Sequence, residues 1–270
     1  MILYTHTVIG VMCYMLLKVI VCLIAGIGAG LGTGFAGMSA AVVISPMLIT
    51  FLGVPAYQAV GIALASDVLA SAVSCYNYKK NGNLDIKNGL IMMATVILFT
   101  MVGSYVSKYV PNNTMGGCSN IMTLFLGIKF IVKPVMTTKE AMLNVDAKKR
   151  VVQSIVCGTF IGFICGFIGA GGGIMMLLIL TSVLGYELKT AVGTSVFIMT
   201  FTALTGAISH FVIGGIFDIT CLVLCVVFTL VFAMLSSKIA NKSTPKVLNR
   251  ITGVVISIIG VVMLIGSNVR

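Results

Sequence analysis

Long uninterrupted runs of apolar residues constrain this chain more than any other feature of its sequence. The runs cover 2–35, 38–53, 57–78, 88–108, 116–134, 150–169, 172–185, 189–213, 219–240 and 250–267. A run of about 20 apolar residues is long enough to cross a hydrocarbon core about 30 Å thick as an α-helix. Two of the runs, 38–53 and 172–185, are short for a full crossing.

The scarcity of charged residues leads to the same conclusion. Only 9% of the residues are charged, whereas ordinary soluble domains carry about 25%. Such a chain cannot cover a water-facing surface. The sequence therefore predicts an all-α fold, a polytopic transmembrane helical bundle, in a multi-pass protein of the cell (plasma) membrane that is surrounded by lipid.

The net charge of +11 comes mainly from polar connectors between the apolar runs. These connectors are 79–87, 107–114, 133–150 and 237–250. Basic connectors are typical of the cytoplasmic side of membrane proteins. A nucleic-acid-binding protein would need a basic, soluble face, so we expect no nucleic-acid partner.

The cysteines and histidines indicate neither a metal site nor an enzyme. The cysteines at 13, 22, 75, 157, 165, 221 and 225 lie within apolar runs, and no CxxC motif occurs. Cys221 and Cys225 are one helical turn apart but have no histidine or acid nearby to complete a metal site. They are best interpreted as small apolar filler. We expect no metal, no cofactor and no enzymatic activity, because one acid within the apolar runs and two distant histidines form no catalytic cluster.

The chain is an internal duplication in which glycines recur at one constant spacing. Seven pairs share this spacing: Gly26 and Gly158, Gly30 and Gly162, Gly34 and Gly166, Gly37 and Gly169, Gly53 and Gly185, Gly61 and Gly193, and Gly82 and Gly214. The tripeptide AVG also occurs at 59–61 and again at 191–193. Duplication on this scale is typical of transporters. We predict membrane repeats at 1–135 and 150–270, joined by a cytoplasmic connector at 136–149.

The distribution of charge predicts that the two repeats have opposite orientations in the membrane. The connector 79–87 carries three lysines, whereas its counterpart at 211–219 has no lysine or arginine. Conversely, 107–118 has one lysine, whereas 238–250 has three lysines and one arginine. Since basic connectors favour the cytoplasm, equivalent connectors lie on opposite sides. Each repeat then has an odd number of crossings: either five, or three plus a re-entrant helix pair.

The glycines serve two different purposes. Those spaced four apart, at 26, 30 and 34 and at 158, 162 and 166, favour close helix packing in lipid. The run GAGGG at 169–173 instead predicts a broken helix, because each glycine costs about 1 kcal/mol of helix stability relative to alanine. It is not a nucleotide-binding loop, because no GK[ST] follows. The first repeat has its own break at 34–41, where Ser39 adds a hydroxyl.

The breaks are candidate anion sites, since a helix that begins there directs free N–H groups and a partial positive charge into the protein. Two such breaks from inverted repeats would meet near the membrane midplane. We expect the substrate-binding residues to be Gly34, Gly37, Ser39, Gly169, Gly171, Gly172, Gly173, Thr194 and Ser195. The alternatives are purely structural breaks, and hydroxyls that bond their own helix backbone.

Asp67 is the candidate coupling residue, because an ionised carboxylate within a membrane is costly and requires a partner or a cavity. Its counterpart in the second repeat is Met199, so it is not a symmetric packing element. A protonated Asp67 would not repel an anion, which makes proton coupling chemically sensible. The alternative is a structural carboxylate paired with a lysine or a serine.

The pattern GFIGAGGG…AVGTS at 166–195, with a weaker copy at 34–61, resembles the TauE/SafE sulfite exporter family. The resemblance covers nearly the whole chain. It implies a transporter of small anions such as sulfite, sulfoacetate or related organic sulfonates, and it alone suggests efflux. The chain departs from the family pattern at 38–40, where a glycine run is usual, and at Leu178, where a proline is usual.

The sequence therefore predicts a secondary transporter of a small anion that works by rocking of one half against the other. No ATPase motif is present, so an ion or substrate gradient would supply the energy. The alternative function is a passive anion channel. Assembly into a homo-oligomer is compatible with either function.

Overall fold

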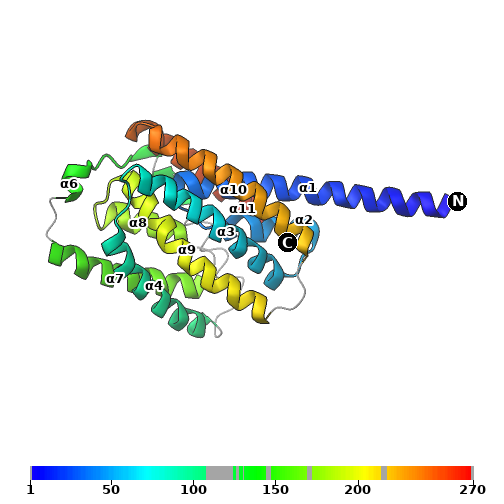
Figure 1. The fold of residues 1–270 in the computed structure, drawn as a ribbon, viewed down its shortest axis with the longest axis horizontal. Coiled ribbons are helices and arrows are strands. Elements are labelled where there is room, and N and C mark those ends of the chain that lie inside the picture. The colour runs from blue at the N-terminus through cyan, green and yellow to red at the C-terminus, as the bar shows by residue number, and fades with distance from the viewer. Residues whose placement is uncertain are drawn as a thin grey trace.

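A computed structural model of the chain describes residues 2–107, 124–125, 128–129, 131–143, 147–168, 172–213 and 218–268. The helices there are α1 (Ile2–Ala36), α2 (Ala41–Leu52), α3 (Ala56–Lys80), α4 (Ile86–Ser107), α6 (Lys139–Leu143), α7 (Ala147–Ile168), α8 (Gly172–Ser182), α9 (Leu188–Ile213), α10 (Ile219–Lys242) and α11 (Pro245–Asn268). No strand occurs in these ranges. The predicted all-α fold is confirmed (Figure 1).

Five of the helices are long and apolar enough to cross a membrane. The candidate spans are Met12–Ala36, Gln58–Lys80, Leu188–Ile208, Ile219–Lys242 and Pro245–Val262. Two shorter apolar segments, Ala41–Leu52 and Ile86–Val102, lie between them in the chain. These spans support a multi-pass membrane protein. Most of the apolar run at 116–134 lies outside the described residues.

The duplication is visible in the backbone. The helix α1 ends at Ala36, and α7 ends at the matching position of the second repeat, Ile168. Gly53 and Gly185, which also match, both follow the short helices with φ of 64°. This left-handed conformation ends a helix and suits glycine, which has no Cβ. The repeat therefore extends from sequence to helix boundaries.

The helices α1 and α2 form an antiparallel hairpin. A Cβ on Gly28 would lie 3.1 Å from Val43, and one on Gly32 would lie 3.3 Å from Met38. The 12 residues of α2 extend only about 18 Å, too short to cross a hydrocarbon core. This geometry favours a re-entrant pair over two full crossings, which the sequence left open.

The two repeats exchange helices. The first helix of each repeat packs along the fourth helix of the other, so that α1 pairs with α10 and α7 pairs with α4. We name α1, α2, α3, α10 and α11 the first bundle, and α4, α7, α8 and α9 the second bundle. The bundles meet mainly where α3 packs against α9. The domain boundaries predicted at 136–149 remain a prediction.

Glycines permit the close approach within each bundle. A Cβ on Gly30 would lie 2.7 Å from the backbone nitrogen of Ala233 in α10, and one on Gly162 would lie 2.5 Å from the carbonyl oxygen of Val96 in α4. Gly26, Gly34 and Gly158 have similarly close neighbours. The packing predicted for these glycines is confirmed, and the neighbours of Gly166 lie outside the described side chains.

The described parts of the connectors at 79–87, 133–150 and 237–250 gather at one end of the molecule. The side chain of Asn83 donates to the side-chain oxygen of Asn241 at 2.8 Å, and Lys139 reaches the carbonyl of Gly82 at 2.5 Å. The helix α10, whose N-cap is Asp218, begins at the opposite end, on the side of the molecule where α1 projects toward the N-terminus (Figure 1). The connectors at 79–87 and 238–250 thus lie together, as expected for one membrane face.

Candidate functional site

The break in the first repeat is a short non-helical turn between α1 and α2. Gly37 has φ of 60°, a left-handed conformation that favours glycine. The hydroxyl of Thr33 donates to the carbonyl of Met38 at 2.9 Å and so helps to hold the turn. The predicted interruption at 34–41 is therefore present as a turn over residues 37–40.

The break in the second repeat separates α7 from α8. Its residues 169–171, including the predicted site residues Gly169 and Gly171, lie outside the described residues. Gly172 begins α8. Next to it, a Cβ on Gly173 would lie 2.7 Å from the backbone nitrogen of Ser39 and 2.9 Å from the carbonyl oxygen of Gly37. Since real Cβ contacts are not this short, the absence of a side chain lets the second break touch the first.

Ser195 of α9 ties the two bundles together at this point. Its hydroxyl donates to the carbonyl of Gly37 at 2.9 Å and lies 3.6 Å from the sulfur of Met199. Ser195 is fully buried. A hydroxyl predicted to bind substrate is thus next to both breaks. We call Gly37, Ser39, Gly173 and Ser195, together with Asp67, the junction.

Asp67 is buried in the middle of α3, with 1% of its surface exposed. Its Oδ2 accepts a hydrogen bond from the hydroxyl of Ser39 at 2.6 Å, and its Oδ1 accepts one from Ser71 at 2.9 Å. The backbone N–H of Ala40 also interacts with this carboxyl. Of the two partners expected for a structural carboxylate, serine is present, and no lysine of the described residues interacts with Asp67.

Two predicted site residues lie away from the junction. Gly34 packs against Ser236 and Ser237 of α10, and its carbonyl accepts from the hydroxyl of Tyr78 at 2.8 Å. Thr194 accepts a hydrogen bond from the backbone N–H of Asp85 at 3.2 Å. Both contacts join helices, and neither group faces Ser39 or Gly173.

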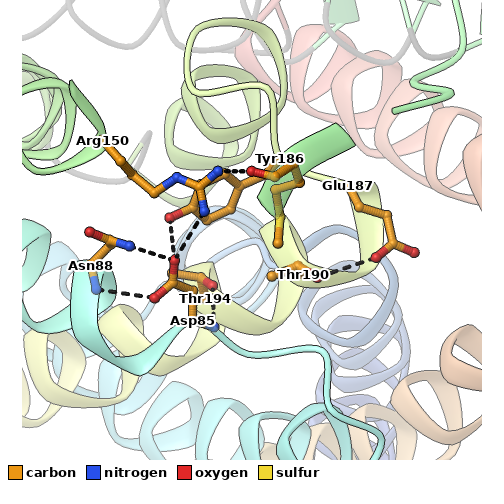
Figure 2. Close-up of polar contacts among 8 residues, drawn as sticks. Asp85, Asn88, Arg150, Tyr186, Glu187, Thr190 and Thr194 are labelled. Atoms are coloured by element: carbon orange, nitrogen blue, oxygen red, sulfur yellow. Dashed lines mark hydrogen bonds and ion pairs between the residues drawn. The ribbon is translucent and has the colours of Figure 1, made fainter. Parts of the chain in front are cut away.

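A second polar cluster, which the sequence reasoning missed, surrounds Asp85 at the end with the basic connectors (Figure 2). The carboxylate Oδ2 of Asp85 accepts from the hydroxyl of Tyr186 at 2.8 Å and from the side chain of Asn88 at 2.7 Å. A guanidinium nitrogen of Arg150 lies 3.9 Å from the same oxygen, and the guanidinium also lies over the Tyr186 ring. Burial raises the pKa of Tyr186, so its hydroxyl remains a donor. We call this ion pair of Asp85 with Arg150 the inner clasp.

An equivalent ion pair joins Lys18 to Asp218 at the opposite end, and we call it the outer clasp. Lys18 and Arg150 occupy matching positions of the duplication, and both belong to the first helix of their repeat. Asp218 and Asp85 each cap the fourth helix, accepting a backbone N–H at 3.1 Å from the residue three positions later. The missed sequence signal was GNLDI at 82–86 and GIFDI at 215–219.

The electrostatics of the outer clasp favour a charged Asp218. Burial by itself would raise the pKa of this carboxyl, but hydrogen bonds from Lys18 and from the N–H of Cys221 lower it below the ordinary value. The nearby thiols Cys22, Cys221 and Cys225 are buried and free. Within the described part of the chain, no group of three histidines, cysteines or acids could hold a metal ion.

Known proteins resemble this chain over most of its length. Residues 22–263 match the family model described as Sulfite exporter TauE/SafE. The chain is 26% identical over 215 residues to "Probable membrane transporter protein YunE" of Bacillus subtilis, covering 72% of this chain and 79% of that protein. It is 29% identical over 201 residues to "Probable membrane transporter protein MJ0441" of Methanocaldococcus jannaschii, covering 72% and 71% of the two chains. No solved structure matches.

Proposed function

Because the chain belongs to the TauE/SafE sulfite exporter family, we propose that this membrane transporter carries a small sulfur oxyanion or organic sulfonate, which binds at the junction. The observation that carries the proposal is the contact between the two breaks, where Gly173 lies against Ser39 and Gly37. The helices α2 and α8 both begin at this contact. Two helix N-termini supply partial positive charge, which suits an oxyanion.

Two serine hydroxyl groups lie beside these helix N-termini. Ser39 and Ser195 come from different bundles, and each lies at a break. An anion held between them would contact both bundles at once. The site then changes its exposure whenever the bundles move relative to one another, which is the requirement for alternating access.

The moving bodies in this mechanism are the two bundles, rather than the two halves of the sequence. Each bundle contains helices of both repeats, and a clasp fastens each exchanged pair at one end. Rocking along the contact of α3 with α9 opens the junction alternately toward each membrane face. In the plasma membrane, inverted repeats place the basic connectors in the cytoplasm, and efflux then runs from that end.

Asp67 supplies the coupling group in this proposal. An ionised carboxylate buried among neutral donors is costly, and it would also repel an anion at Ser39. Protonation of Asp67 removes both penalties. Anion movement through this site is therefore expected to be coupled to proton movement.

Flux through purified protein in liposomes tests the proposal. Sulfite, sulfate, methanesulfonate and acetate are compared, with and without a pH gradient. Gly173→Ala is expected to abolish flux of the preferred anion, whereas Gly206→Ala, whose new Cβ would meet the flexible side chain of Leu64, is expected to retain it. Full flux through Gly173→Ala would contradict the site, and electrical currents far above carrier turnover would indicate a passive anion channel.

A further inference from the structure

Ser39 lies between a buried carboxylate and accessible space. Its neighbours Met38 and Ala40 are fully buried, as is Asp67, whereas Ser39 itself keeps part of its surface exposed. The hydroxyl of Ser39 donates to Asp67 at 2.6 Å. Any ligand that reaches this part of the junction therefore meets Ser39 before it meets the carboxylate.

The direction of the hydrogen bond between Ser39 and Asp67 decides whether the Ser39 hydroxyl can donate to a ligand. A hydroxyl has one hydrogen to donate. While Asp67 is ionised, that hydrogen is committed to the carboxylate, and the oxygen of Ser39 also accepts the N–H of Ala41 at 3.3 Å. An anion approaching Ser39 then finds an occupied donor and a negative charge behind it.

We infer that Ser39 couples anion binding to protonation of Asp67, so that one anion and one proton cross the membrane together. The inference rests on the function proposed above. A proton arriving at Oδ2 turns the carboxyl into a donor, and the Asp67 O–H then donates to the oxygen of Ser39. The hydrogen bond reverses, and the hydrogen of Ser39 becomes free to donate to the anion. The proton remains on Asp67 until the anion leaves.

Among the described residues, Asp67 has no ionisable neighbour that would share its titration. Its interactions come from Ser39 and Ala40 at the break and from Ser71 on α3. Among the described residues of α1, α2, α9 and α10, which pack against α3, no charged side chain interacts with it. Along α3, the nearest ionisable side chains on the side of the basic connectors, Cys75, Tyr76 and Tyr78, are two to three turns away.

Ser71 has a different role from Ser39. It is fully buried on the same helix as Asp67 and donates to the other carboxylate oxygen. It orients the carboxyl so that Oδ2 faces Ser39. Among the side chains that the structure describes, that of Ser39 connects the carboxyl to the break between α1 and α2.

Methanesulfonate is the first probe, because its charge does not change with pH, and sulfite is the second. In liposomes with an internal pH dye, a methanesulfonate or sulfite gradient should move protons in the same direction as the anion. Apparent affinity should fall about tenfold per pH unit once Asp67 is ionised. Asp67→Asn, which mimics the neutral acid, should transport the anion without proton movement and without pH dependence.

Ser39→Ala separates coupling from a structural role. It should lose about tenfold in anion affinity near pH 5, where the freed hydroxyl binds the anion, and little near pH 8. Ser66→Ala is the matched control, because among the described residues that hydroxyl bonds within its own helix, to the carbonyl of Ile62 at 2.8 Å. An equal loss at every pH, or wild-type anion flux without proton movement, would overturn the inference and leave the proposed anion transport intact. No flux of either probe in the wild type would overturn both.

Discussion

The two hairpins of this molecule share a backbone plan but differ in chemistry. In the first, α1–α2, the break carries Ser39, and the neighbouring α3 carries Asp67 and Ser71. In the second, α7–α8, the matching positions are Gly171, Met199 and Ala203. The second hairpin supplies instead Gly173 and, from α9, Ser195, whose own counterpart is Ala63.

The comparison shows that the two repeats keep the same backbone plan, whereas their functional side chains differ. The ionisable group and its hydroxyl partners belong to the first repeat, while the second repeat brings a side-chain-free helix start against them. One carboxyl is enough for one coupled proton. A second carboxyl at Met199 would place like charges near one another in a medium of low dielectric constant, which is costly.

The largest expected effect comes from replacing Asp67 with methionine, the residue at the matching position of the second repeat. Asp67→Met should abolish proton movement, because a thioether cannot hold the proton or accept the strong hydrogen bonds of Ser39 and Ser71. Methanesulfonate flux with an internal pH dye measures the loss. The control is Met199→Leu, a volume-conserving change. Unchanged proton movement in Asp67→Met would remove the proposed distinction between the repeats.

The inner clasp should matter more for stability than the outer clasp. Arg150→Met should lower the free energy of unfolding by about 3 kcal/mol, because it removes one partner of a buried ion pair. The side chains of Arg150 and Asp85 are only 8% and 16% exposed. Denaturation in detergent measures the change, with the exposed Arg250→Met as control. A loss no larger than the control's would show that the clasp contributes nothing.

The outer clasp should contribute about 1 kcal/mol and should depend on pH. The pKa of Asp218 is lowered in the folded protein, so its contribution is present above the ordinary value of 3.8 and is lost as the pH falls through the lower folded value. The difference in melting temperature between wild type and Lys18→Met should therefore shrink as the pH drops below about 4. A difference that grows on acidification would contradict this assignment.

The smallest expected effect comes from substitutions that compare the backbone where the short helix of each repeat ends. Gly53→Ala and Gly185→Ala should each cost roughly 1 kcal/mol, because alanine is strained in the left-handed conformation. Both positions have φ of 64° and nothing within 4 Å of the new Cβ, so the two costs should be equal. Thermal unfolding of the two variants side by side measures them, and a large difference would mean that the two helix ends are not equivalent.

Much of the fold was predictable because its causes are local in the sequence. The apolar runs specify helices in lipid, since every backbone polar group must be satisfied within the segment. The spacing of Gly26 and Gly30 specified close packing, and the glycine run beginning at Gly169 specified a break before the helix that the structure begins at Gly172. The ion pairs of the two clasps could also have been predicted from the sequence. Aligning Asp85 with Asp218 requires a spacing one residue longer than the spacing that aligns the glycines.

The site was only partly predictable, because side chains adjacent in sequence face different ways on a helix. Thr194 and Ser195 looked equivalent, yet one contacts Asp85 and the other Gly37. The partner of Asp67 was also undetermined, since a serine and a lysine were equally compatible with the sequence.

The sequence by itself determined that this chain is a duplicated helical membrane protein with interrupted helices, because hydrophobic length, charge and glycine spacing act along the chain. The tertiary structure decided which helices belong together and what the breaks contact. Exchange of the first helices places Lys18 against Asp218 and Arg150 against Asp85, although the members of each pair are distant in sequence. Packing between distant segments depends on surface shape and burial in three dimensions, and no spacing along the chain specifies it.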